Sequence, residues 1–353
     1  MTQSHRIGMA VCVALTTVVV ALAAKPAWAA EHNWKMPTSW GGGPLQEIGA
    51  KAFANKVAEL TEGRVKVQVF PSGTLTKGLE VRSAVAKGVA EAGHTWMGYD
   101  WGKDKTTVLF GGFAGSMDTE RMLHWIYEGG GLKLWRDYNE ERFGVVSFPC
   151  FARTAEAFLH LRKPIRSLAD LKGLKFRTAG AWLAISKGLG AAPVTMPGGE
   201  VYATLERGAI DATEWGTLYE NKSTGFHKIA KYVIVPGIHQ PTAPFEVVIN
   251  KTAWGKLSDR DRQMVELAAK LVTLESWMKI GHEDAQALEF YKQQGNEVIE
   301  LDPAVQREGK ALAVTWAEEQ AKGNAWFKKV WDSQRAYEKL WENASSYRNV
   351  KYK

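Results

Sequence analysis

Cysteine is almost absent from this sequence of 353 residues, in which only Cys12 and Cys150 occur. Cys12 lies in an N-terminal segment that we expect to be removed, so Cys150 would remain alone and no intramolecular disulfide could form. The stability of the fold must therefore come from the burial of apolar side chains.

Long apolar runs are scarce as well, and the unbroken one extends from Met9 to Ala24. It is shorter than the roughly 20 residues that cross a bilayer as a helix. A short basic opening precedes it, and the small residues of Ala27–Ala29 follow it. This pattern predicts a signal peptide over residues 1–29, cleaved after Ala29 or Ala30, and a periplasmic mature protein.

Signatures of catalysis are missing too. The glycine triplets at 41–43 and 129–131 lack the strand, lysine and hydroxyl residue of a phosphate-binding loop. There is no Gly-x-Ser-x-Gly elbow, no pair of histidines three or four residues apart, and no histidine near Cys150 in sequence. The sequence therefore gives no support to an enzyme.

Charge and tryptophan content point instead to a small anionic ligand. The net charge is +7, but lysine and arginine form no block, so we expect no nucleic-acid binding, and the mild basic bias suits an anionic solute. Of 15 tryptophans, several stand near predicted turns or strand ends, where aromatic side chains often line pockets. These are Trp40, Trp96, Trp101, Trp182 and Trp215.

Apolar periodicity alternates between helix and strand along the chain. A helix is predicted from Pro44 to Leu60, and a strand follows over 64–70, where every second residue is valine. Further helices are predicted at 79–87, 119–127, 132–142, 181–189 and 200–207, and further strands up to Thr95 and at 145–148, 174–178 and 209–214. Ser258 caps a helix to about Lys292, roughly 50 Å long and thus longer than one domain. Two α/β domains that share crossovers fit this pattern best.

The segment from Leu171 to Leu257 contains three motifs whose order and spacing are specific. They are LKGLKFRTAG, GAAPVTMPGGEVYATLERGAIDATEW and GFHKIAKYVIVPGIHQPTAPFEVVINKTAW. With the earlier GRVKVQVFPSGTL and EAGHT, they resemble the solute-binding proteins of TRAP transporters, the DctP family. Within that family the sequence is most similar to the branch that binds 2-oxo and 2-hydroxy monocarboxylates.

The resemblance implies a two-lobed, periplasmic binding protein-like α/β fold with crossover strands and a long helix that spans both lobes. On this basis we expect lobe I to comprise residues 31–150 and about 241–280. Lobe II would comprise 151–240 and about 281–353, with the C-terminal helices.

The resemblance also implies a binding site. Arg177, on the strand after LKGLK, would hold the solute carboxylate with two parallel N–H donors. In the Asp211–Trp215 motif, Glu214 would give its carboxylate and Trp215 its backbone carbonyl to a cation such as Ca²⁺ or Na⁺. The Trp215 indole would pack on the solute, and no organic cofactor is expected.

At 152–156 the sequence Ala-Arg-Thr-Ala-Glu departs from the pattern of this branch. Glu156 stands where a glutamine would ligate the metal, so two carboxylates would favour a divalent ion. Alternatively, Glu156 could pair with Arg153 and leave no metal. Arg153 could also hold a second acidic group, as in a dicarboxylate or a larger acid, or it could be a plain ion-pair partner.

The remaining polar and aromatic contacts follow the pattern imperfectly. Gln240 and Glu246 are candidates for polar contacts, with Glu246 as a further metal ligand. Tyr99 and Trp101 occupy the place of an aromatic cluster, and Trp96 stands where a small residue is usual. The identity of the solute therefore stays open.

The resemblance implies a non-enzymatic protein that captures a small organic carboxylate for the membrane permease subunits of a TRAP-type transporter. Two alternatives remain at this point: a protein that presents its ligand to a sensor or chemoreceptor, and a metal-assisted enzyme acting on an oxo acid. A homodimer formed through the C-terminal helices is also open.

Overall fold

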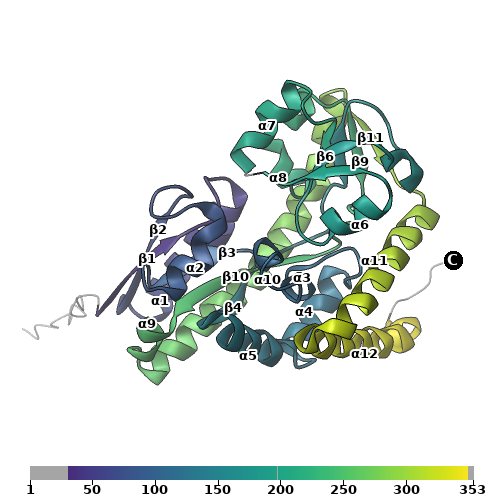
Figure 1. The fold of residues 1–353 in the computed structure, drawn as a ribbon. Helices are drawn as coiled ribbons and strands as arrows, with labels where there is room; N and C mark the ends of the chain where they lie inside the picture. The colour runs from purple at the N-terminus through teal and green to yellow at the C-terminus, as the bar shows by residue number, and fades with distance from the viewer. Residues whose placement is uncertain (1–30, 197, 349–353) are drawn as a thin grey trace, which may run out of the picture.

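The computed structural model describes residues 31–196 and 198–348 of the chain. The predicted signal peptide lies outside these residues. The described part is an α/β structure with two lobes, and helices surround the sheets of each lobe (Figure 1). Among the described helices, none is both long enough and apolar enough to cross a membrane.

Lobe I contains two small sheets. β1 (His32–Pro37) pairs in parallel with β2 (Val65–Phe70). The second sheet has the order β3–β10–β4, in which β10 (Ala243–Asn250) runs antiparallel to both β3 (Ala92–Thr95) and β4 (Val145–Arg153). Because its central strand β10 comes late in the sequence, the chain returns to lobe I after it has built most of lobe II.

Lobe II is built on a six-stranded sheet with the order β11–β9–β5–β8–β6–β7. Its strands are β5 (Leu159–Leu161), β6 (Lys175–Arg177), β7 (Ala192–Val194), β8 (Ala212–Thr213), β9 (Tyr232–Val235) and β11 (Glu297–Glu300). The sheet is mixed, because β5 runs antiparallel to its neighbours β8 and β9 whereas the other pairs are parallel.

Twelve helices surround these sheets in the described part of the chain. They are α1 (Ala52–Leu60), α2 (Val81–Ala86), α3 (Thr107–Gly111), α4 (Thr119–Tyr127), α5 (Gly131–Phe143), α6 (Trp182–Gly188), α7 (Gly198–Glu206), α8 (Leu218–Lys222), α9 (Lys251–Gly255), α10 (Asp259–Gln293), α11 (Pro303–Gly323) and α12 (Ala325–Arg348).

The predicted alternation of helices and strands is confirmed, with local differences. The helix expected from Pro44 begins with a π-helical segment, Leu45–Lys51, before α1. The strand expected at 209–214 is reduced to β8, because the Ala209 N–H still bonds to Thr204 O at the end of α7 (3.1 Å). The capping box of Ser167 and Asp170 is present ahead of β6.

The long helix is confirmed as α10, which has 35 residues and is about 50 Å long. Ser258 caps it by accepting a hydrogen bond from the Asp261 N–H. Its first part packs on α1 and β4 in lobe I, and its last part reaches α8 and β11 in lobe II. It therefore spans both lobes.

The C-terminal helices lie differently from the division that we expected. α11 contacts α6 in lobe II, but α12 packs on α3, α4 and α5, which belong to lobe I (Figure 1). The Gln334 side chain donates to Leu109 O (2.7 Å), and the Trp125 indole donates to Ser333 Oγ (3.1 Å). These contacts place α12 with lobe I, whereas residues 281–353 were expected in lobe II.

A buried ion-pair network holds lobe I together. Arg82 donates to Asp100 (2.6 Å), to Asn139 and to Glu246, and Ser147 Oγ donates to the other oxygen of Glu246 (2.6 Å). All five side chains are almost fully buried. Removal of the guanidinium would leave Glu246 without a counter-charge in a dry interior, whereas Asp100 would keep its pair with Lys103 Nζ (2.7 Å).

We expect Arg82→Ala to lower the free energy of unfolding by about 3–5 kcal/mol, because it leaves the buried Glu246 without its charged partner. The matched control is Arg260→Ala, in which an exposed pair with Glu62 (3.5 Å) is removed; about 0–1 kcal/mol is expected there. Urea unfolding followed by circular dichroism measures both values. Equal losses in the two variants would contradict the role given to Arg82.

Candidate functional site

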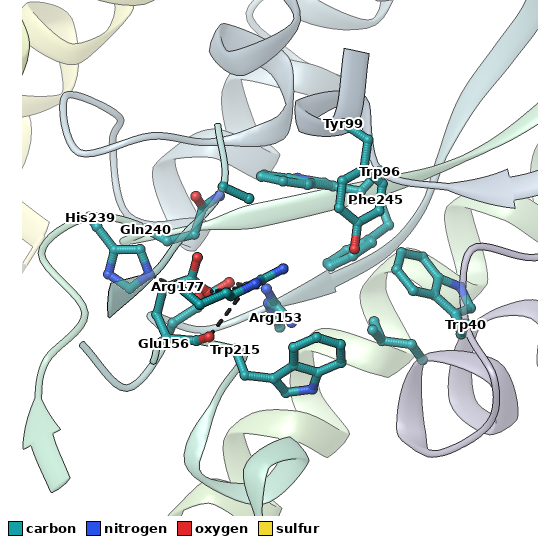
Figure 2. A pocket seen from close by; sticks show the side chains of 13 residues that line it. Trp40, Trp96, Tyr99, Arg153, Glu156, Arg177, Trp215, His239, Gln240 and Phe245 are labelled. Carbon is teal, nitrogen blue, oxygen red and sulfur yellow. Dashed lines mark hydrogen bonds and ion pairs between the residues drawn. The ribbon is translucent and has the colours of Figure 1, made fainter. Parts of the chain in front are cut away.

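A small enclosed pocket lies where the two lobes meet (Figure 2). Its volume is about 30 Å³, measured as the space open to the centres of water molecules, and one water needs roughly 10–15 Å³ by this measure. Its polar wall consists of Arg153, Glu156, Arg177, Glu214, His239 and Gln240. Its aromatic wall consists of Trp40, Trp96, Tyr99, Trp215 and Phe245.

Arg177, at the end of β6, presents one edge of its guanidinium to the pocket. Its Nη1 donates to the side chain of Glu214 (2.9 Å) and to the Glu214 carbonyl (3.2 Å). Its Nε is buried without a hydrogen-bond partner, and no described residue accepts a hydrogen bond from Nη2. The Nε–Nη2 edge, which can bind a carboxylate through two parallel bonds, is therefore unused by the described part of the protein.

Arg153, at the end of β4, is engaged much more fully. Its Nη1 donates to Glu220 on α8 (2.6 Å), and its Nη2 pairs with Glu156. The second oxygen of Glu156 contacts His239 Nε2 (2.9 Å). Both Nη atoms of Arg153 are thus paired with carboxylates. This agrees with the alternative in which Arg153 is an ion-pair partner of Glu156.

Burial and pairing set the protonation of these groups. Burial would raise the pKa of Glu156, but Arg153 and the hydrogen bond from His239 outweigh it and lower that pKa. Burial raises the pKa of Glu220, although Arg153 opposes the shift. Burial also raises the pKa of Tyr99, so its phenol remains a neutral donor.

The aromatic wall is fixed by hydrogen bonds behind it. The Trp40 indole donates to His94 Nδ1 (2.8 Å), so His94 Nε2 carries the proton that is donated to Cys150 O (2.7 Å). Burial lowers the pKa of His94 to about 4, which keeps the ring neutral. Phe245 packs edge-on against Trp40, with ring centroids 5.4 Å apart. The wall is therefore held in one arrangement near neutral pH.

Gln240 is oriented by two backbone carbonyls. Its Nε2 donates to Gly111 O (2.9 Å) and to Thr242 O (2.8 Å), which fixes the amide so that Oε1 is the free acceptor. Since Gln240 lines the pocket, this oxygen is available to a ligand.

Trp101 and Glu246, which we expected at the site, lie outside this pocket. Glu246 directly follows Phe245 on β10, and because side chains alternate along a strand it points to the opposite face, where Arg82 and Ser147 bind it. Trp101 follows the helical turn Met97–Asp100 and packs against the large core. The proposed metal and solute contacts of these two residues therefore have no support.

Sequence reasoning missed His239, Glu220 and Phe245. His239 precedes Gln240 in the same motif, so the motif itself offered a signal. Glu220 pairs with Arg153 across 67 residues, which leaves no local pattern. Phe245 could have been found from Glu246, because neighbouring strand residues face opposite sides.

The polar wall brings two carboxylates, which are ligands that hard cations prefer, close to one imidazole. One ligand atom from each of Glu156, Glu214 and His239 can be chosen so that all lie within 4.8 Å of one another. Two ligands of one calcium ion, each about 2.4 Å from it, are separated by up to roughly 5 Å. Two buried carboxylates at this spacing fit a divalent cation better than a monovalent one.

Comparisons with known proteins agree with this geometry. The chain matches the model of the family DctP, bacterial extracellular solute-binding protein family 7, over residues 37–322. It is 31% identical over 326 residues to a monocarboxylate 2-oxoacid-binding periplasmic protein of Nostoc sp., covering 90% of this chain and 88% of that one.

Two solved structures show the same fold. A TRAP periplasmic solute-binding protein from Colwellia psychrerythraea, with bound calcium and pyruvate, has a TM-score of 0.83 and 27% identity, covering 89% of this chain and 97% of that one. A counterpart from Pseudoalteromonas atlantica, with bound sodium and pyruvate, has a TM-score of 0.84 and 25% identity, covering 90% and 97%.

Because His94 is neutral in the folded protein, we expect the free energy of unfolding to depend on pH. Because the folded pKa is about 4 and the ordinary value is 6.5, the unfolded chain binds more protons between these values. Stability should therefore fall as the pH is lowered from about 6.5 to about 4. His94→Gln, which keeps a donor and an acceptor, should show a shallower fall in urea unfolding at a series of pH values. Identical pH profiles for the two proteins would contradict this.

Proposed function

We propose that this chain, which belongs to the DctP family of bacterial extracellular solute-binding proteins (family 7), captures a small 2-oxo or 2-hydroxy monocarboxylate between its lobes. The solute would then pass to the membrane subunits of a TRAP-type transporter. The observation that carries the proposal is the unused Nε–Nη2 edge of Arg177 in an enclosed pocket. The similar Nostoc protein and the pyruvate-bound neighbours support the solute class.

A monocarboxylate fits the pocket better than a dicarboxylate. Both Nη atoms of Arg153 are already paired with Glu156 and Glu220. A second carboxylate of the solute would therefore find no guanidinium edge with two free N–H donors. Arg153 would thus shape the site and offer the solute at most its buried Nε. Gln240 Oε1 and the Tyr99 phenol would form hydrogen bonds with the polar atoms next to the carboxylate of the solute.

We further propose that Glu156, Glu214 and the Trp215 carbonyl hold a calcium ion beside the solute. The two guanidiniums of the pocket, on Arg153 and Arg177, pair with three carboxylates: Glu156 and Glu214 in the pocket wall, and Glu220 behind it. An added solute anion would leave two uncompensated negative charges in a buried site. A bound divalent cation supplies two positive charges there, which removes the repulsion.

The same pairing argues against catalysis. Glu156, Glu214 and Glu220 each bind an arginine, and such ion pairs make poor general bases. We therefore expect binding and release without turnover. Removal of the signal peptide after Ala29 or Ala30 would put the mature protein in the periplasm, which agrees with the periplasmic Nostoc relative.

We expect Arg177→Lys to weaken the binding of pyruvate at least tenfold, equivalent to about 1.4 kcal/mol. Lysine keeps the charge beside Glu214 but loses the planar fork that matches a carboxylate. Isothermal titration calorimetry in the presence of calcium measures the change. Arg166→Lys, at an exposed pair with Glu297, should bind like the wild type. An affinity of Arg177→Lys within a factor of about three of the wild type would exclude Arg177 as the anchor.

We expect removal of bound calcium by a chelator to lower the affinity for pyruvate at least tenfold. Added calcium should restore it, whereas the same concentration of sodium should not, because the carboxylate-rich site needs two positive charges. Glu214→Gln should weaken calcium binding about 10–100-fold, measured by calorimetry with the metal alone. Unchanged pyruvate affinity after complete chelation would rule out the shared cation.

A further inference from the structure

Trp96 is held rigidly at the junction of the lobes. It directly follows β3, and its indole Nε1 donates to Gly111 O (2.8 Å). Its ring lies over Gly98, where an added Cβ would come within 2.2 Å of Trp96 Cη2. Trp96 is also in contact range of lobe II, because a Cβ on Gly180 would be 3.4 Å from the same ring atom.

Two other rings lock Trp96 in place. Tyr99 packs edge-on against it, with ring centroids 5.2 Å apart, and the centroid of Phe245 lies 6.5 Å away. Together with the hydrogen bond to Gly111 and the contact with Gly98, these rings hold the indole in one position. Only 7% of its surface is exposed, so it acts as a fixed part of the pocket wall.

The polar and aromatic walls face each other across the pocket. In Figure 2, Arg177, His239 and Gln240 lie on one side, and Trp96, Tyr99, Phe245 and Trp40 lie on the other. A solute whose carboxylate binds Arg177 therefore extends its carbon chain toward the aromatic wall. The cavity of about 30 Å³ has room for roughly two water molecules by the same measure.

We propose that Trp96 sets the length of the solute and restricts it to unbranched acids of about three or four carbons. The inference rests on the proposed function, since it takes the carboxylate to be bound at Arg177. A longer chain would have to displace an indole that is hydrogen-bonded to Gly111 and packed against Tyr99 and Phe245. Such a clash gives discrimination of about 10–200-fold per added methylene.

The test is the selectivity of the calcium-loaded mature protein among 2-oxo acids. Calorimetry would give the affinities for unbranched acids of three, four, five and six carbons, for the wild type and for Trp96→Ala. We expect the wild type to prefer the three-carbon acid over the six-carbon acid by at least about 100-fold. In Trp96→Ala this ratio should fall at least about tenfold, because the removed indole leaves room for the longer chain.

Two further variants keep the test decisive. Trp96→Phe keeps an aromatic ring but is shorter and lacks the donor to Gly111, so it should give an intermediate ratio even if Trp96→Ala does not fold. Trp254→Phe, which changes a tryptophan packed on Phe148 away from the pocket, should keep the wild-type ratio.

The outcomes separate the two proposals. If the wild type binds all four acids with similar affinity, or if the Trp96 variants keep its ratio, Trp96 does not set the length of the solute and the proposed function stands. If the wild type binds none of the acids in the presence of calcium, the proposed function fails, and the length limit fails with it.

Discussion

Two guanidinium groups buried between the lobes constrain this protein most, because each needs a carboxylate partner within reach. Arg153 lies at the end of β4 and pairs with Glu220 on α8, which joins a strand of lobe I to a helix of lobe II. Arg177 on β6 pairs with Glu214, which follows β8 in the same sheet. A buried charge that loses its partner costs several kcal/mol, so the pair of Arg153 and Glu220 favours one arrangement of the facing lobes. The pair of Arg177 and Glu214 holds one wall of the pocket within lobe II.

The segments that connect the lobes also supply the polar wall of the pocket. The chain leaves lobe I between β4 and β5, where Glu156 lies, and returns between β9 and β10, where His239 and Gln240 lie. Hydrogen bonds join the two crossings directly, from Glu156 N–H to Gln240 O (3.2 Å) and from Gly237 N–H to Glu156 O (2.6 Å). A rotation of the lobes about these segments would therefore move residues of the polar wall of the pocket.

The sequence predicted the α/β alternation and the long helix, because periodicity and caps are local signals. The family resemblance placed Arg177 and Glu214 at one site, but their direct ion pair was not predicted. It did not predict that α12 packs on lobe I, since an amphipathic helix does not reveal which surface covers it. Glu246 was misassigned because its strand position was not compared with that of Phe245, one residue before it. The contact between Arg153 and Glu220 depends on the folded arrangement of β4 and α8, which no local pattern encodes.

The charge count links solute, cation and lobe closure in the proposed function. An anion that arrives alone adds a fourth carboxylate to two guanidiniums that three carboxylates already share, so the closed site becomes more negative and closure is opposed. A cation that arrives alone binds Glu156 and Glu214 but leaves the Arg177 edge without an acceptor in a dry pocket. When both are present, the charges balance and the buried N–H donors of Arg177 are satisfied. Closure is therefore favoured by the pair of ligands together, because each ligand offsets the electrostatic cost of burying the other.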